Sequence, residues 1–278
     1  VHMDTGAIDF NRWNSARGPV IPACAGQQAL DPRARCSTGP IDLQLSAANA
    51  RYAGLLLKLD HRWSRKFQFT AAYALASSVG LNRIINNDNW FESYGPTAGD
   101  RRHSLTASGI VDLPWGLRLS SISTFQSKPP FRAQIAGIDF NGDGTINDLL
   151  PGTKWNELNR GLSKTDLRRL VDNYNTTLAG SRTPTGQVIP RVNLPADFEF
   201  SDRFFSTDIR LGKIISFRER YELNVFGEVF NLLNIANLTG HSTDLLQSSA
   251  FGQPASRATQ VFGSGGPRAF QLAARFSF

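Results

Sequence analysis

The chain has 278 residues, of which 41% are hydrophobic, and its 30 basic and 23 acidic residues give a formal net charge of +7. No segment approaches the ~20 consecutive apolar residues of a transmembrane helix, which excludes a helical membrane span. The basic residues are scattered rather than clustered, which argues against nucleic-acid binding. Residues 1–5 lack the basic start and apolar core of a signal peptide, so we expect the C-terminal portion of a longer precursor.

Residues 1–50 precede the first strand-like segment and are predicted to form an extracellular loop. This segment contains the only two cysteines, Cys24 and Cys36. We expect a disulfide between them, because such a bond persists outside the cell and would stabilise the loop by about 3 kcal/mol. A pair of metal ligands is the alternative interpretation.

From residue 51 onward, seven segments alternate between apolar and polar residues with the period of a β-strand. In the first segment, for example, Leu57 and Leu59 lie on one side while Lys58 and Asp60 lie on the other. Each segment is about as long as the ~9 to 11 residues that a tilted strand needs to cross a bilayer. The predicted strands are about 51–63, 67–78, 102–115, 117–129, 203–217, 221–234 and 267–278.

The connections between these segments alternate in length. Tight turns are predicted at 64–66, 114–116 and 218–220, whereas the intervening connections at 78–101, 129–202 and 235–266 are far longer than usual. Short turns at one rim and long loops at the other are typical of outer-membrane barrels, whose short turns face the periplasm. The sequence therefore predicts an all-β, antiparallel up-and-down transmembrane barrel segment with long extracellular loops.

The loop at 78–101 combines carboxylates with aromatic rings, as sugar and peptide sites do. Its members are Asp88, Trp90, Phe91, Glu92 and Tyr94. Trp90, Phe91, Glu92 and Tyr94 are candidate ligand contacts. Aromatic residues at a membrane interface give the same pattern, so that interpretation stays open.

Residues 139–148 begin like the calcium-binding loop of an EF-hand, with oxygen-bearing side chains at alternate positions and Gly144 at the sixth. The candidate ligands are Asp139, Asn141, Asp143, Thr145, Asn147 and Asp148. The twelfth position, where a bidentate glutamate belongs, is Leu150, and Asp148 is the nearest substitute. Calcium is therefore the only candidate cofactor, and an Asn/Asp/Gly turn without a metal is the alternative.

Four arginines stand at the predicted extracellular starts of strands, on the same side as the apolar row. They are Arg51, Arg101, Arg203 and Arg268. At the outer rim of a barrel their guanidinium groups would meet the phosphates of lipopolysaccharide. The alternative is that each strand simply starts with a charged residue that is exposed to solvent. Lys213, by contrast, falls within an apolar row, which only snorkelling or a local bulge explains.

The last strand ends the chain on an aromatic residue. Its apolar row includes Phe270, Leu272, Phe276 and Phe278, whereas the ends of soluble chains usually fray. This row favours a strand with lipid on one side and a polar lumen on the other, with Phe278 at the periplasmic rim. Seven strands cannot close in lipid by themselves, so we expect the C-terminal part of a larger barrel.

No catalytic constellation is evident. The four histidines, His2, His61, His103 and His241, lie in separate segments, and the chain has neither a nucleophile elbow nor a glycine-rich phosphate loop. Enzymatic activity is therefore not expected. The alternative to a membrane barrel is a secreted or surface-attached all-β binding or structural protein with a calcium-stapled loop.

Taken together, several motifs resemble the C-terminal signature of TonB-dependent outer-membrane receptors, and in particular the Oar-like group. They are 226–234 (FGEVFNLLN), 237–238 (NL), 251–252 (FG), 267–268 (PR) and 275–278 (RFSF), with further matches at 52–62, 67–77, 100–103 (DRRH) and 139–148. The resemblance is loose from Asp4 onward and good over the last ~60 residues.

This resemblance implies a barrel of about twenty-two strands around an N-terminal plug, which takes up a scarce solute by coupling to the TonB complex. It implies that the remainder of the barrel, the plug and the TonB-contacting segment lie outside this sequence. It also implies that barrel assembly machinery reads the final strand through Phe276 and Phe278. The expected location is the bacterial outer membrane, with lipopolysaccharide as a partner.

Overall fold

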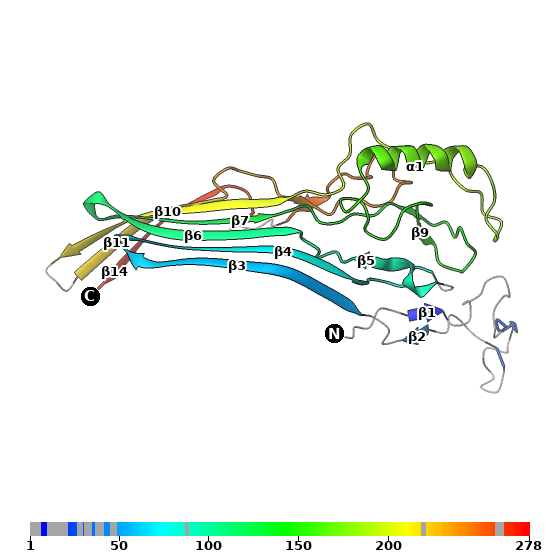
Figure 1. Ribbon diagram of the computed structural model, residues 1–278, viewed down its shortest axis with the longest axis horizontal. Helices are drawn as coiled ribbons and strands as arrows, with labels where there is room; N and C mark the ends of the chain where they lie inside the picture. Colours follow the sequence, from blue (N-terminus) through cyan, green and yellow to red (C-terminus); the bar gives the residue numbers. More distant parts are fainter. Residues whose placement is uncertain are drawn as a thin grey trace.

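The computed structural model describes residues 7–9, 22–26, 30, 35–36, 42–44, 49–86, 89–217, 221–258 and 264–278. One long antiparallel sheet runs along the molecule, and its loops gather at one end (Figure 1). Its main strands are β3 (Ala50–Ser64), β4 (Phe67–Leu81), β6 (His103–Leu113), β7 (Leu117–Gln126), β10 (Phe204–Phe217), β11 (Tyr221–Phe230) and β14 (Ala269–Ser277).

The remaining elements are short and lie in or beside the loops. They are β1 (Ala7–Asp9), β2 (Asp42–Gln44), η4 (Trp90–Ser93), β5 (Tyr94–Pro96), η5 (Pro114–Gly116), β8 (Gln134–Ala136), β9 (Asn147–Leu149), α1 (Lys164–Thr177), β12 (Leu238–Thr239) and β13 (Ser256–Arg257). Within the described ranges, no helix has the length and apolar character needed to cross a membrane.

The seven long strands follow one another in the sheet in the order β14-β11-β10-β7-β6-β4-β3, and each pairs antiparallel with its neighbours in sequence. The prediction of an all-β, antiparallel up-and-down sheet of about seven strands is therefore confirmed. The two outer strands, β3 and β14, have no strand partner on their free edges among the described residues. The C-terminus lies at the end with the short turns (Figure 1).

The pairing register aligns apolar residues across the sheet on one face, which we call the apolar face. One row joins Leu57, Tyr73, Leu105, Phe125 and Phe205, and another joins Phe67, Val111, Leu119, Leu211, Gly227 and Leu272. Because side chains alternate along a strand, a shift of one residue in any pair would break these rows. The period-2 pattern in the sequence thus specifies both the strands and their register.

The apolar face is open to the surroundings. Leu57 and Leu59 are 54% and 60% exposed, and Leu272 is 87% exposed. In a soluble sandwich these side chains would pack against a second sheet, but among the described residues no second sheet covers them. An extended, aligned and exposed apolar face of this kind is stable only against lipid or a partner.

The two described turns at the other end of the sheet are tight. Arg65 and Lys66 both have positive φ, 49° and 73°, which is the backbone that matches the twist of a two-residue hairpin. In the next turn Trp115 and Gly116 have φ of 64° and 71°. The predicted turn at 218–220 lies outside the described residues.

Three strands end three or four residues from their predicted bounds, each for a local reason, while the other ends of the long strands fall within two residues of the prediction. β4 continues to Leu81 because its last residues pair with β5. β7 ends at Gln126, shortly before Pro129 and Pro130, which cannot donate to a strand ladder. β11 ends at Phe230 because Asn231 takes a left-handed φ of 46°.

The main hydrophobic core lies in the loops rather than in the sheet. We call this part the loop cluster (residues 128–202 and 240–253). Its buried side chains include Ile135, Leu150, Leu158, Leu167, Tyr174, Phe198, Leu245 and Phe251. Each buried apolar side chain of this size contributes roughly 1.5–3 kcal/mol, so the loop cluster can hold its shape in water.

Helix α1 covers one side of the loop cluster (Figure 1). It begins at a capping box in which Ser163 and Asp166 bond reciprocally, and its buried residues are Leu167, Val171 and Tyr174. Residues 129–202 were predicted as one long loop, and this helix within them was not predicted. Ser163 followed by Asp166 was the signal that marks its start.

Candidate functional site

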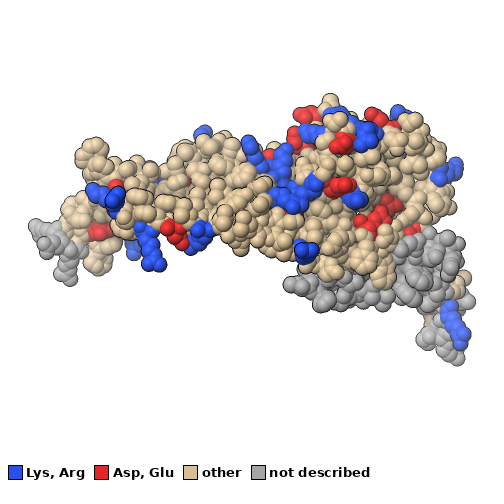
Figure 2. All heavy atoms as spheres, in the orientation of Figure 1, with Lys and Arg blue, Asp and Glu red and all other residues tan. Residues whose placement is uncertain are grey.

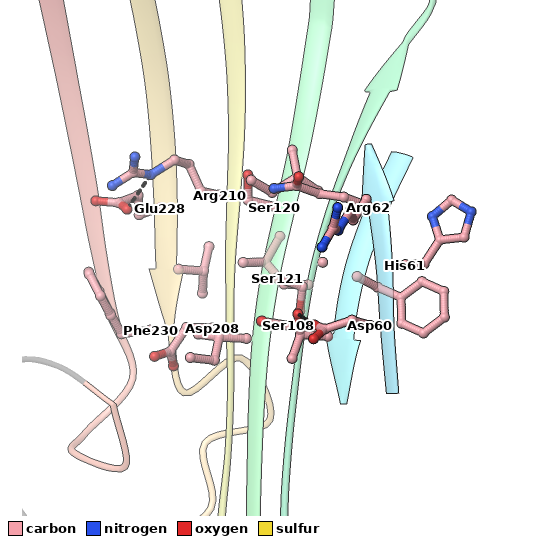
Figure 3. A pocket seen from close by; sticks show the side chains of 18 residues that line it. Asp60, His61, Arg62, Ser108, Ser120, Ser121, Asp208, Arg210, Glu228 and Phe230 are labelled. Atoms are coloured by element: carbon pink, nitrogen blue, oxygen red, sulfur yellow. Dashed lines mark hydrogen bonds and ion pairs between the residues drawn. The ribbon is translucent and has the colours of Figure 1, made fainter. Parts of the chain in front are cut away.

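The face opposite the apolar one carries most of the polar side chains of the sheet, and we call it the polar face. Register places Asp60, Thr70, Ser108, Ile122 and Asp208 in one row, and Gln68, Ile110, Ser120, Arg210 and Glu228 in the next. These rows line a cavity of about 610 Å³ (Figure 3). Six strands contribute to it, namely β3, β4, β6, β7, β10 and β11.

Charged groups in and beside this cavity are paired, either across strands or along one strand. The Arg210 Nε donates to the Glu228 carboxylate at 2.5 Å, and its guanidinium lies 4.5 Å from the centre of the Phe226 ring. The Thr70 hydroxyl donates to Asp60 at 2.6 Å, and Lys58 lies 2.6 Å from the same carboxylate. Such an arrangement offers hydrogen bonds of both kinds to a polar solute or surface.

A β-bulge alters one edge of the sheet. The register between β3 and β4 shifts between His61 and Ser64. Beyond this shift the guanidinium of Arg118 lies 5.7 Å from the Trp63 ring, while the Arg118 Nε donates to Asp112 at 2.7 Å. The alternation of apolar and polar residues predicts a regular strand here and gives no sign of the bulge.

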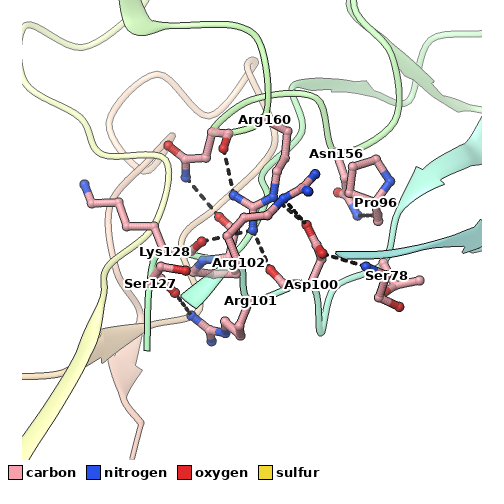
Figure 4. A network of polar contacts seen from close by, with 12 residues as sticks. Ser78, Pro96, Asp100, Arg101, Arg102, Ser127, Lys128, Asn156 and Arg160 are labelled. Carbon is pink, nitrogen blue, oxygen red and sulfur yellow. Dashed lines mark hydrogen bonds and ion pairs between the residues drawn. The ribbon is translucent and has the colours of Figure 1, made fainter. Parts of the chain in front are cut away.

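A buried ion pair joins the loop cluster to the tops of the strands (Figure 4). The side chain of Asp100 is fully buried, and that of Arg160 is 7% exposed, with their Oδ2 and Nε atoms 2.5 Å apart. Asp100 also accepts a bond from the Ser78 backbone N–H at 2.7 Å, and Arg160 donates to the Lys128 carbonyl at 3.1 Å. Sequence reasoning missed Arg160, because its partner lies 60 residues away and no local pattern marks it.

Asparagines of the C-terminal motif hold the start of the last long loop. The Asn231 amide is buried and donates to the carbonyls of Ile235 and Gly266. The Asn237 side chain accepts a bond from the Phe205 backbone N–H at 2.8 Å and donates to the Gly265 carbonyl at 3.1 Å. The motif therefore fixes how the last loop leaves β11 and returns to β14.

Phe251 and Gly252 of the same signature lie in the loop cluster. The Phe251 ring is fully buried and contacts Phe131 and Phe198, with ring centres 5.8 and 5.5 Å away. Gly252 has a φ of 68°, and a Cβ at this position would lie 2.7 Å from the Phe198 Cβ. Only glycine fits such an approach without strain.

The proposed calcium ligands lie in the turn before β9 and in the first two residues of that strand. Asp139 accepts bonds from the backbone N–H groups of Gly142 and Gly144, at 2.6 and 2.9 Å, and Asp143 accepts from Thr145 at 2.7 Å. Burial, together with the negative charges of Asp143 and Asp139, raises the pKa of Asp148 to about 6. Their role as calcium ligands stays a prediction, which calcium titration of the purified protein can test.

Within the described ranges, no group of three or more His, Cys, Asp or Glu is arranged to hold a metal ion. His61 lies on the apolar face, stacked on Phe67 with ring centres 4.3 Å apart, and points away from the cavity of the polar face (Figure 3). His103 lies within hydrogen-bond distance of the Tyr73 hydroxyl, at 2.8 Å. Burial lowers the pKa of His241, which favours its neutral form. His2 lies outside the described residues.

Cys24 and Cys36 form a disulfide in the structure, with Cα atoms 4.8 Å apart.

The candidate ligand contacts of the loop at 78–101 lie in η4 and β5. Phe91 and Tyr94 are 60% and 43% exposed, and Glu92 accepts a bond from the Asn86 side chain at 2.5 Å. They do not line the cavity of the polar face, and Asp88 lies outside the described residues.

The four arginines of the predicted rim lie at the loop end of the strands, but in different settings. Arg51, Arg203 and Arg268 are exposed. Arg101 is half-buried and donates to the Ser127 carbonyl at 3.0 Å, because the adjoining loop folds over it. Its guanidinium is therefore less free to project outward than the pattern of alternation predicted. Contact with lipopolysaccharide stays a prediction for all four.

Lys213 lies on the apolar face, as the sequence pattern predicted. Register places it opposite Leu117, the first residue of β7, and opposite Val225. It is therefore close to the turn end of the sheet, where a long side chain can extend its ammonium group into the headgroup region. The only register shift among the long strands lies at His61 and Ser64, so no described bulge accounts for Lys213.

The sheet topology, its exposed apolar face and its polar opposite face have a counterpart among known families. The family model of the outer membrane beta barrel domain matches residues 4–271, which is nearly the whole chain. A comparison with curated proteins finds no match. The strands have the length needed to cross a bilayer, and the tight turns at one end and long loops at the other also fit this match. The chain therefore belongs to the outer membrane β-barrel domain family, whose place is the bacterial outer membrane.

Proposed function

We propose that this chain forms the last seven membrane-spanning strands of a TonB-dependent outer-membrane receptor of the Oar-like group, which takes up a scarce solute by energy-coupled transport. The observation that carries the proposal is the cavity of the polar face, in which side chains from six strands combine carboxylates, guanidinium groups and hydroxyls. A polar, concave inner surface behind a lipid-type outer face suits a barrel that surrounds a plug or a solute path.

The open edges of the sheet support the larger barrel. The free edges of β3 and β14 are largely unpaired among the described residues, and unpaired strand edges are costly in lipid. Further strands between them would close the barrel around the polar face. The plug and the TonB-contacting part would then belong to other segments of the same protein, and the chain itself would need neither an enzymatic site nor nucleic acid as a partner.

The proposed orientation puts the short turns and Phe278 in the periplasm and the loop cluster outside the cell. The folded loop cluster supports this orientation, because it has its own buried core and can stand in water as a receptor surface. The C-terminal signature supports it as well, since Asn231 and Asn237 shape the loop before the last strand.

Uptake by cells that carry the intact gene tests this function. Depletion of solutes from a defined medium is measured by mass spectrometry for wild-type cells, cells that lack this protein and cells that lack TonB. We expect at least one solute to be depleted by wild-type cells only. If cells without the protein deplete the same solutes at the same rate, or if uptake continues without TonB, the proposal is wrong.

A further inference from the structure

A second pocket lies where the strands meet the loop cluster, and we call it the junction pocket. Its volume is about 380 Å³, and its walls include Gln126 of β7, Phe204 of β10, Phe131 and Phe200 of the loop cluster, and Thr239 of β12. It is separate from the cavity of the polar face, with which it shares no lining residue. The sequence pattern placed Arg101 and Arg203 at the outer rim of the barrel, but it assigned no role to Arg132 or to the pocket itself.

Three arginines, Arg101, Arg132 and Arg203, line the junction pocket against a single carboxylate, that of Asp202. The fixed charges of the lining therefore sum to +2, from three positive groups and one negative group. Both oxygens of Asp202 already accept backbone bonds, from the N–H of Arg203 at 3.0 Å and from that of Leu238 at 3.3 Å. Figure 2 shows basic side chains gathered near the middle of the molecule, where strands and loops meet.

The arginines are not fully satisfied by the described part of the protein. The Nε of Arg132 is buried without a hydrogen-bond partner, and its guanidinium stacks on Trp155 at 4.4 Å from the ring centre. Arg101 has one hydrogen bond, to the Ser127 carbonyl. Burial, and after it the positive charge of Arg160, lowers the pKa of Arg101. Burial, and after it the positive charge of Arg83, lowers the pKa of Arg132. A buried donor without an acceptor and unbalanced positive charge both favour an anionic ligand.

We propose that the junction pocket binds an oxyanion, a phosphate or carboxylate group, through Arg132 and Arg203 with support from Arg101. The planar guanidinium groups suit such oxygens, because they can donate two parallel bonds to one group. The rings of Phe131 and Phe200 offer apolar walls to the body that carries the oxyanion. The oxyanion belongs either to a free solute or to a lipopolysaccharide headgroup. The inference rests on the pocket alone and does not require the chain to transport anything.

Titration calorimetry on the protein extracted from outer membranes in neutral detergent tests the proposal, with inorganic pyrophosphate and purified lipopolysaccharide as separate probes. The variants Arg132→Gln and Arg203→Gln each remove a charge-assisted donor pair, so we expect the dissociation constant to rise about 10- to 100-fold. Arg191→Gln is the matched control, because Arg191 is an exposed arginine that does not line the pocket. Its dissociation constant should stay within about twofold of the wild type.

Saturable pyrophosphate binding that depends on Arg132 and Arg203 supports a free solute, and the same dependence with lipopolysaccharide alone supports a headgroup. Absence of saturable binding to both probes overturns the proposal, as does equal weakening by Arg191→Gln, which would indicate non-specific attraction. Arg203 is exposed, so its replacement leaves packing intact, and unchanged heat-modifiable migration on gels verifies that each variant is folded.

Discussion

Replacing Arg160 with alanine is expected to weaken the packing of the loop cluster against the ends of the strands and to make its local opening more frequent. The change removes the shorter ion pair of the fully buried Asp100 carboxylate. Among the described residues only the pair with Arg102 then remains, whose Nε lies 3.4 Å away and whose side chain is 41% exposed. Removing one partner of a buried ion pair costs about 3–5 kcal/mol. Proteolysis of the loops on intact cells measures the effect, and cleavage should accelerate about 100-fold or more if it follows local opening.

Arg169→Ala is the control for this prediction. Arg169 also pairs with an aspartate, Asp166, but at 3.6 Å and with a side chain that is 73% exposed, so its loss should cost less than about 1 kcal/mol. A double variant with Asp100→Asn should recover part of the lost protection, because no charge then stays buried. Equal cleavage rates for Arg160→Ala and Arg169→Ala would show that the buried pair does not hold the loops.

Replacing both Phe276 and Phe278 with serine is expected to lower the amount of protein in the outer membrane. These rings are 55% and 89% exposed on the apolar face of the last strand, and Phe276 stacks near Tyr221 with ring centres 5.9 Å apart. Against lipid each ring contributes roughly 1.5–3 kcal/mol of burial. We also propose that assembly machinery reads this aromatic end. Fractionation and heat-modifiable migration on gels measure the outcome.

Ser277→Ala combined with Arg275→Gln provides the matched control, because both residues lie on the polar side of the same strand. Register places Arg275 opposite Asn224 and Ser277 opposite Glu222. This pair of changes should leave membrane levels near those of the wild type. Unaltered levels in the double serine variant would remove the support that the terminal aromatic row gives to a membrane strand.

The strands and their faces could be predicted because alternation is a local signal. The row that joins Leu57, Tyr73 and Leu105 follows from three separate segments, each with its own period of two. The turns at 64–66 and 114–116 could be predicted as well, since these short connections are the only places where the chain can reverse between the neighbouring strands. The bulge at His61 was not predicted, because an extra residue in a strand changes the register without changing composition.

The loop cluster could not be predicted, because its contacts join distant segments. Phe131 meets Phe251 across more than a hundred residues, and Arg160 reaches Asp100 from a different loop. Arg132 carries no local signal either, as nothing around it in the sequence indicates that its Nε is buried over Trp155. Functional pockets built from such contacts become visible only in three dimensions.

The most direct test of the membrane-spanning sheet is the accessibility of single cysteines to a membrane-impermeant maleimide. Ile146→Cys lies in the calcium-like turn, where Ile146 is 52% exposed, and Lys66→Cys lies in a tight turn at the other end of the sheet. Cys24 and Cys36 are bridged and do not react without reductant. We predict that intact cells label Ile146→Cys only, and that Lys66→Cys reacts once the outer membrane is opened. Equal labelling of both positions on intact cells would contradict a sheet that crosses the membrane, and labelling of Lys66→Cys alone would reverse its orientation.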